Sequence, residues 1–183
     1  MPETNATEFL QMIQEAFIEG ASEDAEDRFV EFVNMNAEDD AIATSVMEMI
    51  DRLDDVRRKF AFDAVVAVVL NTPRASVMHQ SALEKWDTLI ERIAEKDIFS
   101  ALDWAAMPCL WSGELESLHV AGLKKWEELL GRAAAGDFDR ALAHARDMEN
   151  SDPRRPFAIT AKLAADLLER KSPGNTATPR PSI

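Results

Sequence analysis

The chain has 183 residues, 46% of them hydrophobic, with six glycines and no tyrosine, a composition that favours a helix-rich globular protein. Its 34 acidic and 20 basic side chains give a formal net charge of −14, and its one cysteine, Cys109, excludes an internal disulfide or a zinc site. No apolar stretch approaches 18 residues and the N-terminus lacks a charged-then-apolar leader, so we expect a cytoplasmic protein that does not enter a membrane.

Apolar residues recur at spacings of three and four along most of the chain, which predicts helices almost throughout. The run Phe60–Leu70 could by composition be a buried strand, but no partner strand exists elsewhere, so we assign a central helix to it. Capping residues, glycines and prolines mark where one expected helix ends and the next begins. The expected helices cover approximately residues 8–19, 23–33, 38–54, 60–70, 75–95, 98–107, 115–135, 138–152 and 156–171.

The first third of the chain holds the whole charge excess. Residues 1–55 contain sixteen acidic side chains against Arg28 and Arg52, whereas the remainder sums to zero. Such a segment repels nucleic acid and anionic membrane and attracts basic groups over a Debye length of about 8–10 Å. We therefore expect a basic protein or basic peptide as the partner, with no direct nucleic-acid binding. The acids that we expect to contact it are Glu23, Asp24, Glu26, Asp27, Glu38, Asp39 and Asp40.

A repeated unit follows. Residues 83–105 and 123–145 are identical at ten of 23 positions, among them Trp86 and Trp126, and a period of 20–50 residues is typical of stacked helical modules. The pattern predicts two helical hairpins over residues 75–153, with Asp137 capping the second helix of the later copy and Pro108 stopping that of the earlier one.

The end of the chain is expected to close the stack. A helix over 156–171, with Ile159, Leu163, Leu167 and Leu168 turned inward, would cover its open end. Residues 172–183 are rich in turn formers and are expected to be a disordered tail. Residues 1–171 would thus form a single all-α domain.

The later copy resembles a tetratricopeptide repeat. Trp126-x-x-Leu129, Phe138 and Asp152-Pro153 correspond to the tryptophan, the aromatic position and the closing proline of that family, although the period of 40 residues exceeds the family's period of about 34. The resemblance implies a scaffold that binds peptides or proteins.

A second resemblance leads to another class of function. Glu23-x-x-Glu26 followed by Glu48-x-x-Asp51 is similar to the carboxylate pattern of the all-helical MazG-like nucleotide pyrophosphohydrolases. The resemblance implies that these four side chains hold Mg²⁺ against a nucleoside triphosphate. The acidic segment offers many such spacings by chance, so we keep this enzyme activity as the alternative.

Aromatic residues between the two hairpins are further candidates. Trp104, Leu110 and Trp111 cluster at a helix end, where aromatic side chains on a rigid scaffold commonly anchor an interface. We therefore expect an all-α protein of eight to nine helices, in antiparallel hairpins stacked as a short α-α repeat array. It would act without cofactor or catalysis, as an adaptor, chaperone-like protein or inhibitor.

Overall fold

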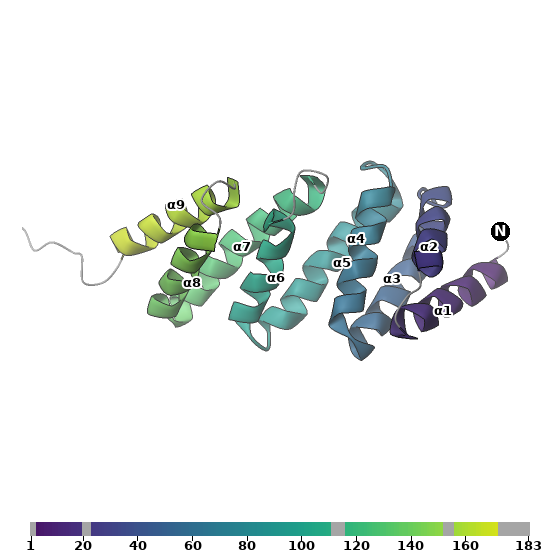
Figure 1. Cartoon of the computed structure of the whole chain (residues 1–183), viewed down its shortest axis with the longest axis horizontal. Helices are drawn as coiled ribbons and strands as arrows, with labels where there is room; N and C mark the ends of the chain where they lie inside the picture. The colour runs from purple at the N-terminus through teal and green to yellow at the C-terminus, as the bar shows by residue number, and fades with distance from the viewer. Residues whose placement is uncertain (1–2, 20–22, 111–115, 152–155, 172–183) are drawn as a thin grey trace, which may run out of the picture. The chain divides into compact units, whose positions relative to one another are not determined.

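The computed structural model describes residues 3–19, 23–110, 116–151 and 156–171, and 91% of these residues are helical. The described residues form nine helices and no strand (Figure 1). The helices are α1 Glu3–Glu19, α2 Glu23–Met35, α3 Asp40–Val56, α4 Arg58–Asn71, α5 Val77–Ala94, α6 Ile98–Leu110, α7 Glu116–Gly136, α8 Phe138–Ser151 and α9 Pro156–Lys171.

The fold is an all-α array of stacked antiparallel hairpins, as predicted. The run expected to be helical at residues 60–70 is α4, and it is buried along most of its length. The chain divides into two compact units, residues 1–92 with 113–121 and residues 93–112 with 122–183. The division falls inside α5 and α7. The expected tail at 172–183 lies outside the described residues.

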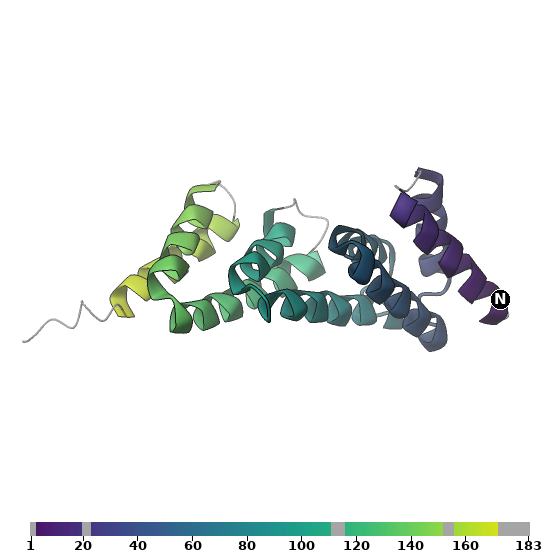
Figure 2. The same cartoon turned by 90° about the horizontal axis from the view of Figure 1, so that it is seen from below.

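Two layers of helices build the first unit. Helix α1 packs against α2 and α3, and α4 packs against the same two helices, so the α1–α2 hairpin contacts the α3–α4 hairpin through both of its helices (Figure 2). Aromatic rings fill the first hairpin: Phe9 stacks on Phe32 with ring centroids 4.6 Å apart, and Phe17 meets Phe29 edge-on at 5.8 Å. The helix predicted to begin after Thr7 begins at Glu3, because burial of Ala6 extends the packed face by one turn.

Two pairs of identical positions in the repeated segments share a feature, either burial or a helix cap. Trp86 and Trp126 are both almost fully buried. The aspartates at the two equivalent turns both cap the following helix: Asp97 accepts a hydrogen bond from the Phe99 N–H at 3.0 Å, and Asp137 accepts one from the Arg140 N–H at 3.1 Å. The predicted cap at Asp137 is thus confirmed.

Helices α6 and α7 approach closely where Gly122 faces α6. A Cβ atom at Gly122 would lie 2.8 Å from the Ala105 carbonyl oxygen and 3.2 Å from Cys109 Sγ. The prediction that α6 stops before Pro108 is wrong, because α6 is helical through Leu110 with Pro108 inside it. A proline in the last turn removes a single backbone hydrogen bond, and Pro108 is buried on the side of Gly122.

The last helix has the predicted bounds, but the face that it buries differs from the predicted one. Ile159 and Leu163 are 60% exposed and Leu167 is 54% exposed, so the expectation that these side chains turn inward is wrong; Leu168 is half-buried. The buried face of α9 consists of Phe157, Ala158, Ala161 and Ala165.

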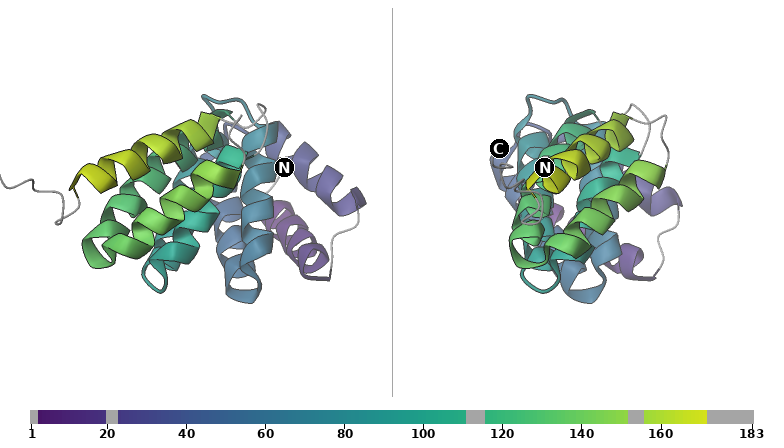
Figure 3. Two further views of the ribbon diagram at one scale, coloured as in Figure 1. Left: turned by 60° about the vertical axis from the view of Figure 1, so that its left-hand side comes forward. Right: turned by 90° about the vertical axis from the view of Figure 1, so that its left-hand side faces the viewer.

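Small side chains explain this orientation of α9. Helix α8 packs against α9 (Figure 3), and the buried face of α9 is mostly alanine, which allows a closer approach of the two helices than leucines would. Arg146 of α8 then ties the pair together by ion pairs to Asp166 at 2.9 Å and Glu169 at 2.7 Å. Phe157 completes the contact by meeting Trp126 edge-on at 5.1 Å.

His144 of α8 lies between aromatic rings in the second unit. Its ring centroid is 6.3 Å from those of Phe99 and Trp126, its side chain is 12% exposed, and its Nε2 is buried without a hydrogen-bond partner. Burial lowers the pKa of His144 below its ordinary value of 6.5 and outweighs the opposing effect of nearby Asp103. The folded protein therefore favours the neutral imidazole.

The two glycines of α7 provide a matched test of close packing. Gly122→Ala should lower the free energy of unfolding by about 1–3 kcal/mol, because the new methyl group collides with the α6 backbone. Gly131→Ala should raise it by about 0.5–1 kcal/mol, since nothing lies within 4 Å of a Cβ there and alanine is the better helix former. Urea unfolding at low protein concentration measures both, and equal effects would contradict the described contact.

The environment of His144 predicts a pH dependence of stability. Because its folded-state pKa is depressed, the unfolded chain binds a proton first, and the free energy of unfolding should decrease as the pH falls below about 6.5. His144→Gln should flatten this part of the profile. Comparison of both chains in urea between about pH 7.5 and about pH 5.5 tests it. Parallel profiles would show that His144 does not contribute.

Candidate functional site

The predicted acidic residues lie on α2 and at the turn into α3. Glu26 and Asp27 are exposed on α2, and Glu38, Asp39 and Asp40 are exposed where the chain enters α3. Glu23 and Asp24 begin α2, and their side chains lie outside the described part of the structure. The structure thus divides the described acids between one helix face and one turn.

Asp39 also has a structural role. It is the N-cap of α3 and accepts hydrogen bonds from the backbone N–H groups of Ala41 and Ile42, both at 3.0 Å. An N-cap aspartate typically stabilises its helix by about 1 kcal/mol. Substitution of Asp39 would therefore affect folding as well as any contact with a partner.

Few of the acids in this segment are neutralised. Among the acidic side chains of residues 6–56 that the structure describes, Asp51 and Asp54 form ion pairs. The two local cations lie elsewhere: Arg28 lies over the Phe9 ring at 5.9 Å, and Arg52 donates to Gln14 at 2.9 Å. Most of the negative charge of this segment is therefore left at the surface.

Asp51 is held by cations from α5. It pairs with Lys85 Nζ at 2.7 Å and Arg92 Nη1 at 3.0 Å. Partial burial raises the pKa of Asp51, but the hydrogen bond from Lys85 and the charges of Lys85 and Arg92 outweigh it, so this pKa lies below its ordinary value. No spacing within residues 1–55 could have indicated this pairing, because both partners lie more than 30 residues away.

The residues of the alternative metal set are not assembled into a described cluster. Asp51 is engaged by two cations, Glu26 and Glu48 are exposed, and the Glu23 side chain lies outside the described residues. Within the described ranges no group of three or more His, Cys, Asp or Glu side chains is placed to hold a metal ion. The pyrophosphohydrolase hypothesis stays a prediction without a geometric observation in its favour.

The aromatic candidates are only partly described. Trp104 lies on α6 and is half-buried, with interactions of its own. Leu110 is the last residue of α6, but its side chain lies outside the described residues, as does the whole of Trp111. Their expected role in binding stays a prediction.

Glu26 borders a hollow that sequence reasoning did not identify. This hollow of about 540 Å³ lies in the first unit and has Phe17, Phe60 and Leu70 among its apolar walls. Lys59 and Asp63 also line it and form an ion pair with each other at 2.6 Å, whereas Glu26 has no ion-pair partner among the described residues. An uncompensated carboxylate thus lies beside an apolar recess.

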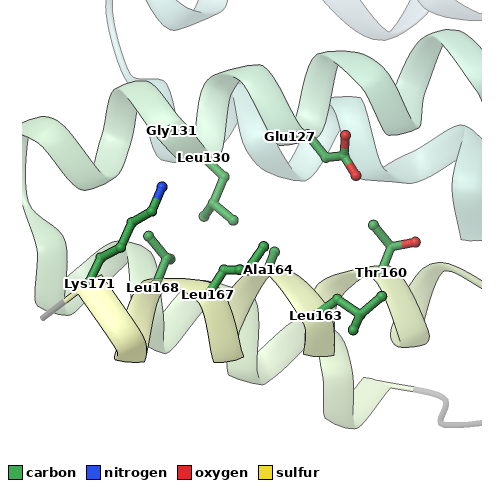
Figure 4. A pocket seen from close by; sticks show the side chains of 9 residues that line it. All are labelled: Glu127, Leu130, Gly131, Thr160, Leu163, Ala164, Leu167, Leu168 and Lys171. Atoms are coloured by element: carbon green, nitrogen blue, oxygen red, sulfur yellow. The ribbon is translucent and has the colours of Figure 1, made fainter.

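A second hollow lies between α7 and α9 and was also missed. It has a volume of about 440 Å³, and Leu130, Leu163, Leu167 and Leu168 line it together with Gly131 (Figure 4). Sequence reasoning assigned three of these leucines to the core, so it could not find a surface here. The alanines at 158, 161 and 165, at helical spacing, were the signal that α9 has a second packing face.

Comparison with known protein families, curated proteins and solved structures finds no match to this chain. None of the described helices is both long enough and apolar enough to cross a bilayer.

Proposed function

We propose that this protein is a non-enzymatic protein-binding module whose acidic N-terminal helices engage a basic partner segment. The observation that carries the proposal is Glu26, an uncompensated carboxylate beside the apolar hollow of Phe17, Phe60 and Leu70. A segment that combines a basic side chain with an apolar one matches both features. An adaptor, a chaperone-like protein or an inhibitor would use such a surface.

The physical roles of the two features differ. Exposed carboxylates attract a basic segment over several ångströms and set its orientation, but exposed ion pairs contribute only about 0.2–1 kcal/mol each. Burial of an apolar side chain in the hollow supplies the larger part of the binding free energy, about 1.5–3 kcal/mol for one leucine-sized group. A basic, amphipathic segment is therefore favoured over a uniformly basic one.

The hairpin array supports this proposal as a scaffold. Stacked hairpins hold helix faces rigidly, so a binding partner meets a surface that loses little entropy on association. The likeness to tetratricopeptide repeats belongs to the same proposal, because that broad class binds peptides.

Binding of a fluorescent basic amphipathic peptide, rich in lysine and leucine, tests the proposal by anisotropy. Affinity should fall steeply as salt rises from about 0.1 M to about 1 M, because the Debye length contracts from about 10 Å to about 3 Å. Glu31 is a further exposed acid on α2, and Glu26→Gln combined with Asp27→Asn and Glu31→Gln should weaken binding by several-fold to tenfold. Leu70→Glu should weaken it as well, since it places a charge in the hollow.

A charge-matched control distinguishes the effect of this surface on affinity from the effect of net charge. Glu84→Gln combined with Glu95→Gln and Asp139→Asn changes the charge equally at exposed sites elsewhere and should leave binding nearly unchanged. Affinity that does not respond to salt, or an equal loss in both triple variants, would contradict the proposal.

A further inference from the structure

The hollow between α7 and α9 belongs to a longer apolar face. Ile159, Leu163 and Leu167 follow one another at intervals of four residues along the exposed side of α9, and each is more than half exposed. Leu130 of α7 and Leu168 of α9 form the inner wall (Figure 4). Large apolar side chains that are contiguous on an exposed helix face are typical of a surface that contacts another protein.

Gly131 gives the hollow a floor of bare backbone. It lies inside α7 and is exposed, and a Cβ there would meet nothing within 4 Å. Glycine inside a helix costs about 0.5–1 kcal/mol relative to alanine, and no contact within the described chain requires it. A glycine at this place allows the backbone of another helix to come close.

The two ends of the hollow have opposite charges. Glu127 lies at the end near Thr160 and Leu163, and Lys171 lies at the other end, where α9 finishes (Figure 4). Neither side chain has an ion-pair partner among the described residues. A helix that enters antiparallel to α9 should therefore bring a cation to Glu127 and an anion to Lys171.

We propose that the occupant is a second copy of this chain, related by a two-fold axis that sets the two α9 helices antiparallel. The symmetry places Lys171 of each copy at Glu127 of the other, while the Ile159–Leu163–Leu167 stripes cover each other over Gly131. Such an isologous contact closes on itself and satisfies both charged ends with the chain's own residues. This inference is independent of the proposed binding of a basic segment.

The expected interface is small. It involves only one helix face and its groove on each copy, and small interfaces are typical of weak association, so we expect a dissociation constant that is micromolar or higher. Sedimentation equilibrium of the full chain over a concentration series measures it. Leu163→Glu should raise the dissociation constant by at least about tenfold, because it buries a carboxylate in the apolar centre. Val120→Glu, an equally exposed apolar position on α7, should leave it unchanged.

A charge swap tests the antiparallel arrangement. Glu127→Lys alone and Lys171→Glu alone should each weaken the dimer several-fold, since each places like charges opposite one another. The double variant should recover most of the affinity, because both ion pairs re-form with reversed sign. A chain that is monomeric at all concentrations, or a double variant weaker than both single ones, would overturn the proposal. Circular dichroism checks that each variant is folded.

Discussion

Close approach of helices through small side chains is the constraint on which the second unit depends. Gly122 lets α7 approach the backbone of α6, and α9 packs against α8 and has a buried face that is mostly alanine. In the same unit the large ring of Trp126 is fully buried and contacts His144 of α8 and Phe157 of α9. Because a methyl group at Gly122 would already collide with a backbone oxygen, the separation of these helices is tightly set.

The orientation of α9 follows from this constraint and determines what is left at the surface. Since α9 buries Ala158, Ala161 and Ala165, Leu163 and Leu167 on another face of the helix stay exposed next to α7. The ion pairs of Arg146 with Asp166 and Glu169 reinforce the same orientation. The first unit has a different surface, in which described carboxylates on α2 and at the turn into α3 have no ion-pair partner, whereas Asp51 and Asp54 later in α3 are paired with cations. The chain therefore offers an acidic surface in one unit and an apolar one in the other.

Periodicity in the sequence was sufficient to predict the helices and their stacking in hairpins, and the aspartate at the α7–α8 turn was sufficient to predict a cap there. Periodicity could not show which face of α9 is buried, because alanines and leucines both recur at helical spacing. Contacts with the neighbouring helix determine which of the two faces is buried. The sequence could not show that α6 continues through Pro108, because the effect of a proline depends on its position within the helix. Of the candidate site, the exposed acids Glu26 and Asp27 could be predicted from charge, whereas both hollows required the tertiary contacts.

The orientation of α9 is tested most directly by comparing two substitutions in that helix by urea unfolding at a concentration where the chain is monomeric. Ala161→Leu should lower the free energy of unfolding by about 1–3 kcal/mol, because the larger side chain has no room against α8. Leu163→Ala should change it by less than about 0.5 kcal/mol, as is usual for an exposed position. A large loss for Leu163→Ala with no loss for Ala161→Leu would show that the leucine face is the buried one and would contradict this account.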